Sequence, residues 1–236
     1  MTEPSTVTIQ SPFGNAGPSR FDPARFEARM RALPARSALR FGAREVPDDF
    51  GRSSVLIAFW HEAEDVRVLL TRRAATLRTQ AGQMSFPGGR LEPGEDWVEG
   101  ALRETDEEVA IPPGAVDVLG RLDDAWSGAR HHLVPIVGWL AEPPAPRPNP
   151  SEVDSIHTPT VSSLLPAAAY SVEPVEIDGE TFHNATLRWA EGEHVFGLST
   201  DLLIEAIQWG LGIETRPGND RRASLRAWLR SRGELR

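Results

Sequence analysis

The 236-residue sequence contains no cysteine. This absence excludes disulfides, cysteine-ligated zinc and a thiol nucleophile, and it is typical of a cytoplasmic chain. No run of about 18 apolar residues is present either, so no membrane-spanning helix is expected. The first twenty residues, MTEPSTVTIQSPFGNAGPSR, lack the basic start and apolar core of a secretory signal. Together these absences predict a cytoplasmic protein without a membrane partner.

Positive charge is also scarce, because 34 acidic residues outnumber 25 lysines and arginines and leave a net charge of −9. A nucleic-acid partner is therefore not expected, since domains that follow a phosphate backbone are usually basic. An acidic protein still binds an anionic small molecule when a cation bridges the two. The oligomeric state, monomer or homodimer, does not follow from the sequence.

Hydrophobic residues make up 40% of the chain, which is enough for one sizeable core. Residues 1–20 are rich in Ser, Thr, Pro and Gly and predict a disordered tail, whereas 21–236 predict a single domain with an N-terminal helix and a C-terminal helical extension. Helices are expected at Phe21–Leu33, Trp97–Val109, Leu202–Trp209 and Ala223–Leu229.

The expected strands follow no regular alternation with these helices. They lie at Ser53–Trp60, Val66–Thr71, Val116–Leu119 and Leu133–Leu140, and near 154–160, 170–176 and 185–196. The first two are predicted to form a hairpin around the turn HEAED, while residues 86–95 and 141–150 are Gly- and Pro-rich loops. This order favours an α+β fold, or an α/β sandwich around a mixed sheet, over a doubly wound sheet.

The stretch RETDEEVA, 103–110, crowds acidic residues into the C-terminal end of the predicted helix. Helical spacing gathers Glu104, Glu107 and Glu108 on one flank and points Asp106 elsewhere. Like charges repel there, and the helix dipole disfavours anions at that end. A solvated charged face is one explanation. A bound divalent cation explains the crowding better, because Mg²⁺ prefers carboxylate oxygens and substrate phosphates.

The loop before this helix supports a metal site. Gly88 and Gly89 allow close approach of the backbone, because neither carries a Cβ. Glu95 lies eight residues before Arg103 and is predicted to hold its guanidinium. Asp96, followed three residues later by a glutamate, predicts a capping box at the helix start.

The segment from Gly89 to Ile111, GRLEPGEDWVEGALRETDEEVAI, resembles the signature of the Nudix hydrolase family, the Nudix box. Matching positions are Gly89, Glu95, Arg103, Glu104, Glu107, Glu108 and Ile111. Thr105 replaces an aliphatic residue, and Ala110 replaces a glycine. If Ala110 has a positive φ, we expect a strain of about 1 kcal/mol there.

This resemblance implies an α/β/α sandwich around a mixed sheet and the hydrolysis of nucleoside diphosphates linked to another moiety. It implies that Glu104, Glu107 and Glu108 ligate Mg²⁺ or Mn²⁺, with the Gly88 carbonyl as a further ligand. It also implies that Glu95 orients Arg103. The box does not identify the general base. Glu152 is a candidate from outside it, although an ordinary loop acid is the slightly favoured interpretation.

The preceding segment, LLTRRAATLRTQAGQMSFPGG (69–89), resembles a motif of the coenzyme A pyrophosphatases within the same family. Matching positions are Arg73, Leu77, Arg78, Gly82, Phe86, Pro87, Gly88 and Gly89. Ala74 and Gln80 depart from it. The likeness extends over roughly 52–210 and implies that Gln80 and Gly89 contact the substrate.

Three arginines in this segment, Arg72, Arg73 and Arg78, also suit phosphate oxygens. Some of them could be plain surface charges, and Arg73 and Arg78 are favoured as binders. His131 and His132 are expected to be structural or exposed.

The sequence thus predicts a metal-dependent enzyme that splits coenzyme A or its derivatives into 3′,5′-ADP and (acyl-)4′-phosphopantetheine. Two alternatives remain open at this point. The first is a Nudix hydrolase of ADP-ribose, dinucleotides or nucleoside triphosphates. The second is a non-catalytic, nucleotide-binding Nudix regulator, although such domains usually lose glutamates that this chain retains.

Overall fold

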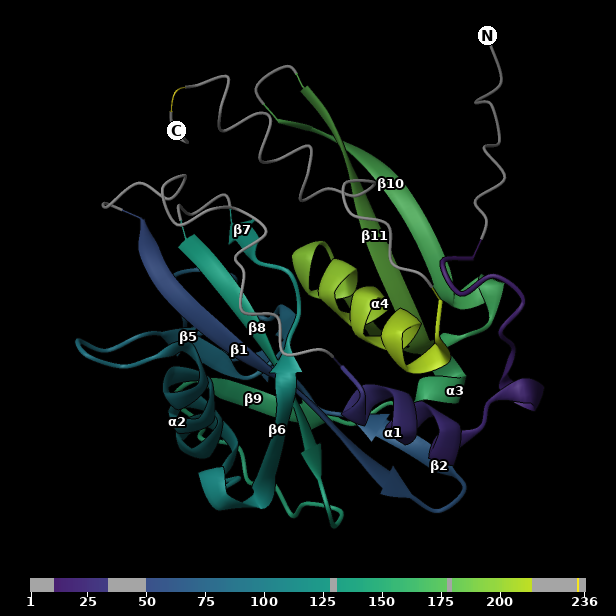
Figure 1. The fold of residues 1–236 in the computed structure, drawn as a ribbon. Coiled ribbons are helices and arrows are strands. Elements are labelled where there is room, and N and C mark those ends of the chain that lie inside the picture. The colour runs from purple at the N-terminus through teal and green to yellow at the C-terminus, as the bar shows by residue number, and fades with distance from the viewer. Residues whose placement is uncertain (1–10, 34–49, 128–130, 178–179, 214–232, 234–236) are drawn as a thin grey trace, which may run out of the picture.

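A computed structural model describes residues 11–33, 50–127, 131–177, 180–213 and 233 (Figure 1). The helix expected at Ala223–Leu229 lies outside these residues. Within them, no helix is long and apolar enough to cross a membrane. The strands of the described part form three sheets, and the helices lie on both sides of the largest one.

The largest sheet has six strands and surrounds the long strand β1. Its members are β1 (Gly51–Glu62), β2 (Asp65–Val68), β5 (Gly88–Arg90), β6 (Val116–Arg121), β7 (Ala125–Ser127) and β8 (His131–Leu140). β1 pairs in parallel with β8 and antiparallel with β2 and β5, while β6 and β7 pair antiparallel with β8. The prediction of a mixed sheet is therefore confirmed.

Alternate residues of β1 enter two different hydrophobic cores, because successive side chains of a strand point to opposite faces. Ile57 and Phe59 pack with residues of α1 (Pro23–Arg31) and α4 (Leu198–Leu211). Leu56 and Ala58 pack on the other face with residues of α2 (Trp97–Val109). Helices thus cover both faces of the central sheet, as Figure 1 shows, and the expected α/β sandwich is present.

Two smaller sheets complete the described fold. One contains β3 (Leu70–Arg73), β4 (Met84–Ser85) and β9 (Val153–His157), and the other contains β10 (Tyr170–Ile177), β11 (Glu180–Ala190) and β12 (Glu193–Phe196). The remaining elements are the short helix α3 (Val161–Leu164) and the 3-10 turns Pro18–Arg20, Pro113–Ala115 and Ala167–Ala169.

Two strand predictions and one loop prediction need correction. The expected strand Val66–Thr71 divides at Leu69, so that β2 completes the predicted hairpin while β3 joins another sheet. The region 185–196 likewise divides into β11 and β12. The loop 86–95 contains β5, because residues 88–90 pair with β1. Pairing partners decide these boundaries, and no local pattern encodes them.

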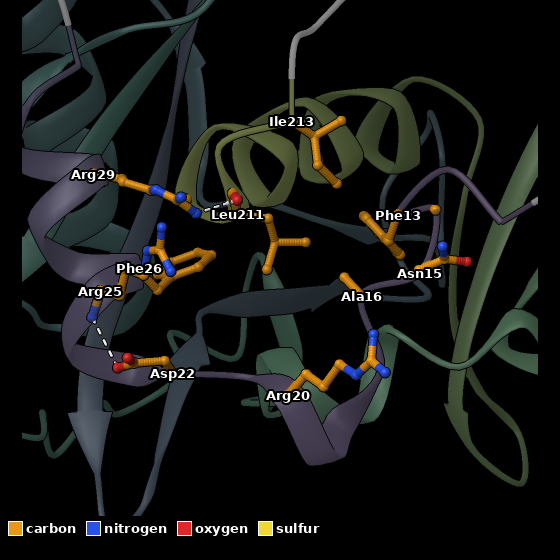
Figure 2. Close-up of a pocket in the computed structure, with 12 residues that line it drawn as sticks. Phe13, Asn15, Ala16, Arg20, Asp22, Arg25, Phe26, Arg29, Leu211 and Ile213 are labelled. Atoms are coloured by element: carbon orange, nitrogen blue, oxygen red, sulfur yellow. Dashed lines mark hydrogen bonds between the residues drawn. The ribbon is translucent and has the colours of Figure 1, made fainter.

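The N-terminal segment packs onto the domain from residue 11 onward. The Phe13 side chain is buried in the core, and Gln208 on α4 donates a hydrogen bond of 2.8 Å to the Pro12 carbonyl. Pro12 and Phe13, which the sequence assigned to a disordered tail, therefore pack on the described domain, and Pro12 contacts α4. Together with α1, this segment and the C-terminal end of α4 line a cavity of about 410 Å³ (Figure 2).

Gly210→Ala is expected to destabilise the protein by about 1–3 kcal/mol. A Cβ at this position would lie 2.1 Å from the ring of Phe26, whose side chain is buried between α1 and α4. Urea unfolding measures the change. Gly114→Ala is the matched control, since nothing lies within 4 Å of its Cβ position. Equal stability of the two variants would contradict the close packing of α1 on α4.

Candidate metal site and substrate cavity

The helix that carries the acidic residues begins and ends as its sequence predicts. Asp96 accepts hydrogen bonds from the backbone N–H of Val98 and Glu99, at 2.8 and 2.9 Å, and the Glu99 carboxylate accepts one from the Asp96 N–H at 2.9 Å. The capping box is thus confirmed. Thr105 is buried on the core side, and its hydroxyl donates to the Ala101 carbonyl at 2.7 Å.

Ala110 ends α2 in the left-handed conformation, with φ of 56° and ψ of 37°. A Cβ is disfavoured there, as the sequence analysis anticipated for a positive φ. We expect Ala110→Gly to raise the free energy of unfolding by about 0.5–1 kcal/mol, since part of the relieved strain is offset by the entropy of glycine. Thermal unfolding measures this change, and a lower melting temperature in the variant would contradict it.

The structure brings together the carboxylates of Glu104, Glu108 and Glu152, whose oxygens lie within 4.8 Å of one another. Glu108 is buried, and the other two are partly buried. Glu152 therefore lies in the cluster, whereas the sequence slightly favoured an ordinary loop acid. Its carboxylate comes from a segment more than forty residues beyond the helix, and only the fold reveals the proximity.

Backbone hydrogen bonds of the Pro-rich loop place Glu152 at the end of α2. The N–H groups of Asn149 and Arg147 donate to the helix carbonyls of Glu108 and Val109, at 2.8 and 2.9 Å. These carbonyls have no partner within the helix itself. The Glu152 carbonyl in turn accepts the Ala74 N–H at 2.8 Å. The loop thus satisfies the helix end and fixes Glu152 between α2 and β3.

Burial makes this cluster costly as a set of anions. It raises the pKa of Glu108 to about 8, with the Glu104 charge as the next cause, and it also raises the pKa of Glu104. The Gly88 N–H donates to the Glu108 carboxylate at 3.3 Å. Three oxygen donors at this spacing fit a hard divalent cation, whose charge would offset both desolvation and mutual repulsion. The chemistry of the donors thus fits Mg²⁺ or Mn²⁺.

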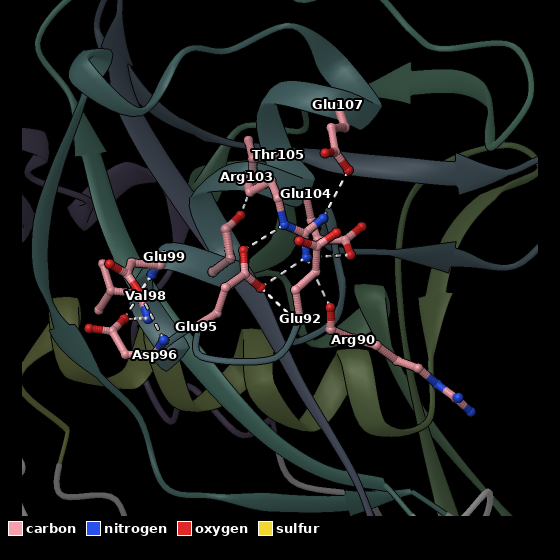
Figure 3. A network of polar contacts seen from close by, with 11 residues as sticks. Arg90, Glu92, Glu95, Asp96, Val98, Glu99, Arg103, Glu104, Thr105 and Glu107 are labelled. Carbon is pink, nitrogen blue, oxygen red and sulfur yellow. Dashed lines mark hydrogen bonds and ion pairs between the residues drawn. The ribbon is translucent and has the colours of Figure 1, made fainter.

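Arg103 organises the exposed edge of the site (Figure 3). Its Nε donates to Glu95 at 2.7 Å, and its Nη atoms contact Glu104 at 3.1 Å, Glu107 at 2.9 Å and the Arg90 carbonyl at 3.0 Å. The expected Glu95–Arg103 contact is therefore present. These hydrogen bonds lower the pKa of Glu95 and raise that of Arg103.

Glu107 lies outside the three-carboxylate cluster in this structure. Its side chain is 55% exposed and points toward Arg103 (Figure 3). Asp106 is exposed as well, as the helical spacing indicated. The role of Glu107 as a metal ligand, which the Nudix box implies, stays a prediction that the geometry does not itself support.

Both glycines before the helix are required by close packing. A Cβ on Gly89 would lie 2.4 Å from the Glu104 carboxyl carbon. Gly88 has a φ of 148°, and its Cβ would lie 2.3 Å from the Ser54 carbonyl oxygen. A side chain at Gly89 would push β5 away from α2, and one at Gly88 would push it away from β1, so the two glycines allow the loop to lie close to the carboxylates.

A cavity of about 400 Å³ adjoins the cluster, because Gly88 and Gly89 form part of its wall. Three predicted substrate contacts, Arg73, Gln80 and Gly89, line it. The cavity is also lined by Ser53, Val55, Thr79, Ser85, Phe86, Arg90, His131, Leu133, Leu198, Ser199 and Leu202. The α4 residues and His131 among them carry no sequence signal that marks a site, since distant segments meet here.

The other two predicted arginines do not line this cavity. Arg72 forms an ion pair with Glu193 at 3.2 Å, and Arg78 is exposed. Arg73 lies between cavity and cluster, where its charge acts on Glu108. Its buried Nε has no hydrogen-bond partner among the described residues. Arg73 is therefore the arginine of this segment best placed to meet a phosphate near the carboxylates.

Comparison with known proteins places this geometry in a family. A family model described as NUDIX domain matches residues 51–177. An uncharacterized Nudix hydrolase, NudL, from Yersinia pestis is 36% identical over 161 residues, which cover 66% of this chain and 78% of that protein. NudL from Yersinia pseudotuberculosis has the same identity and coverage.

Solved structures of lower similarity include a MutT/nudix family protein from Enterococcus faecalis, with 14% identity and a TM-score of 0.46. That match covers 89% of this chain and 76% of the other. A C. elegans Ap4A hydrolase has 20% identity and a TM-score of 0.40, and the match covers 45% and 77% of the two chains. On the family match and the NudL relatives, the chain belongs to the NUDIX domain family and is a Nudix hydrolase.

Proposed function

We propose that the protein hydrolyses the pyrophosphate bond of coenzyme A or its derivatives and releases 3′,5′-ADP and (acyl-)4′-phosphopantetheine. The observation that carries a metal-dependent pyrophosphate reaction is the cluster of Glu104, Glu108 and Glu152 beside a cavity. The choice of coenzyme A rests on the likeness of residues 69–89 to the coenzyme A pyrophosphatase motif. Arg73, which matches that motif, lines the cavity and supports this choice, and Gln80, which departs from the motif, lines the same cavity.

The proposed roles follow from where each side chain lies. Glu104, Glu108 and Glu152 hold Mg²⁺ or Mn²⁺, and the family pattern adds Glu107 and the Gly88 carbonyl. The bound ion supplies charge neutralisation of the pyrophosphate and lowers the pKa of an attacking water. Arg73 binds a pyrophosphate oxygen. Arg103, held by Glu95, positions Glu104.

The reaction itself is an in-line displacement at phosphorus. The water oxygen forms a bond to phosphorus as the bridging P–O bond breaks, and the leaving phosphate takes the electron pair. A carboxylate of the cluster accepts the proton of the water. Glu152 and Glu104 are the candidates for this base, because their oxygens lie within 4.8 Å of the other carboxylate oxygens of the cluster. The products carry the two phosphates separately, so no further reactant is needed.

A substrate panel tests this proposal. The full-length protein is incubated with Mg²⁺ or Mn²⁺ and with coenzyme A, ADP-ribose, a dinucleotide or a nucleoside triphosphate, and products are identified by mass spectrometry. We expect 3′,5′-ADP and phosphopantetheine from coenzyme A. Rapid turnover of ADP-ribose with intact coenzyme A would refute the substrate assignment. Absence of any turnover would favour the nucleotide-binding regulator instead.

A further inference from the structure

A chain of hydrogen bonds crosses one wall of the substrate cavity and ends on an arginine. The Ser53 hydroxyl lies 2.8 Å from Nδ1 of His131, and Nε2 of the same ring lies 3.0 Å from a guanidinium nitrogen of Arg90. All three residues line the cavity. None of them matches a position of the motifs that imply the metal site or the coenzyme A preference.

The direction of each hydrogen bond between Ser53, His131 and Arg90 follows from the chemistry of the groups. A guanidinium only donates hydrogen bonds, so Nε2 of His131 is the acceptor and Nδ1–H donates to Ser53. Burial and the Arg90 charge lower the pKa of His131, which favours this neutral form. The ring therefore presents a lone pair to Arg90 and holds one edge of its guanidinium.

The His131 ring is also held in place by packing. β1 and β8 pair so that Gly51 stands opposite His131. A Cβ on Gly51 would lie 2.8 Å from the imidazole Cε1, so the ring rests directly on the glycine. Ser53, two residues further along β1, is itself buried. The support for Arg90 is thus built into two neighbouring strands.

The backbone carbonyl and the side chain of Arg90 point in different directions. Its carbonyl accepts a hydrogen bond from Arg103 at 3.0 Å, beside the acidic cluster. Its side chain extends away from the carboxylates, as Figure 3 shows. Within the described residues, Arg90 forms no ion pair with a carboxylate, and His131 occupies only part of its five N–H groups. The remaining N–H groups are available to an anion in the cavity.

We infer that Arg90, positioned by His131 and Ser53, determines specificity for a nucleotide that carries a phosphate monoester in addition to its pyrophosphate. Arg73 and the carboxylate cluster serve the pyrophosphate, and Arg90 serves the monoester on another part of the same cavity wall. A volume of about 400 Å³ is within the range of small-ligand sites. This inference rests on the proposed function, because it assumes that the nucleotide part of the substrate occupies this cavity.

Nucleotide binding tests the inference without requiring turnover. Isothermal titration of the intact protein compares 3′,5′-ADP with 5′-AMP. The two nucleotides share the 5′-phosphate and differ by the 3′-phosphate alone, which is the group that is a monoester in coenzyme A. We expect the wild type to bind 3′,5′-ADP roughly 10–100-fold more tightly, as one charge-assisted bidentate contact would provide. Arg90→Gln is expected to remove this preference while it leaves 5′-AMP affinity unchanged. Equal affinity of the two nucleotides for the wild type, or binding of neither, would overturn the inference.

Further variants separate charge from position. Arg52→Gln is the control, because it removes an equal charge from the same sheet. Arg52 stacks on Trp97 and does not line the cavity. This variant should therefore prefer 3′,5′-ADP over 5′-AMP as strongly as the wild type does. His131→Phe keeps a ring but cannot accept from Arg90, and we expect a partial loss of preference that His131→Gln restores in part. An Arg90→Gln variant that keeps the full preference would refute the role of Arg90.

The same measurements distinguish this inference from the proposed function. A preference for 3′,5′-ADP that depends on Arg90, in a protein that does not cleave coenzyme A, refutes the reaction but supports the monoester site. Cleavage of coenzyme A together with equal nucleotide affinities refutes the monoester site alone. The ratio of kcat/KM for coenzyme A and dephospho-coenzyme A gives an independent check, and it should fall to about one in Arg90→Gln.

Discussion

Glu108→Gln is expected to lower turnover by about two orders of magnitude or more while the protein stays folded. The substitution keeps the size of the side chain but removes the negative charge from the most buried member of the carboxylate cluster. Loss of outer-shell partners alone typically costs metal sites 10–100-fold, and loss of a ligand should cost about that or more. Steady-state kinetics in Mg²⁺ and titration of Mg²⁺ or Mn²⁺ measure the two consequences.

Asp106→Asn is the matched control, because Asp106 lies on the same helix but is exposed and outside the cluster. Its rate and metal affinity should match the wild type. A rate near that of the wild type in Glu108→Gln would refute the metal site.

Glu107→Gln tests the ligand that only the family pattern implies. Reduced metal affinity supports it, whereas unchanged affinity with lower stability restricts Glu107 to pairing with Arg103.

The parts of the site that sequence predicts well are those encoded by neighbouring residues. The bounds of α2 follow from the capping box at Asp96, and the contact of Glu95 with Arg103 follows from their short separation around one turn and helix start. The strained end at Ala110 follows from a missing glycine. Each of these features depends on interactions within about twenty residues, so a local pattern carries enough information.

Features that join distant segments could not be predicted in this way. Glu152 reaches the cluster because a Pro-rich loop binds the end of α2 and because β9 pairs with β3. Arg90 meets His131 because β5 and β8 both flank β1. These contacts depend on strand pairing and register, which the sequence of each strand leaves undetermined. Closeness in sequence is also a poor guide to a shared site. Arg72 and Arg78 do not line the substrate cavity, although Arg73 between them does.

In the absence of divalent cations, the free energy of unfolding is expected to fall as the pH rises from about 5 to about 8. Glu108 has its pKa raised by burial from 4.5 to about 8 in the folded protein. Below both values the two states bind the proton equally. Between them the unfolded chain ionises while the folded chain keeps its proton, so stability declines, by on the order of 3–5 kcal/mol at about 1.4 kcal/mol per unit. Urea unfolding in EDTA measures this slope.

Glu108→Gln isolates the contribution of Glu108 to the pH dependence of the free energy of unfolding, because the variant loses this titrating group and keeps the others. The depressed pKa values of His131 and His157 act in the opposite direction near pH 6, and they cancel in the difference between wild type and variant. The variant should therefore be the more stable protein at pH 8 without metal. Excess Mg²⁺ should reverse this order, since it stabilises only a folded state that holds the ionised carboxylate. Parallel pH profiles of the two proteins in EDTA would contradict the assignment.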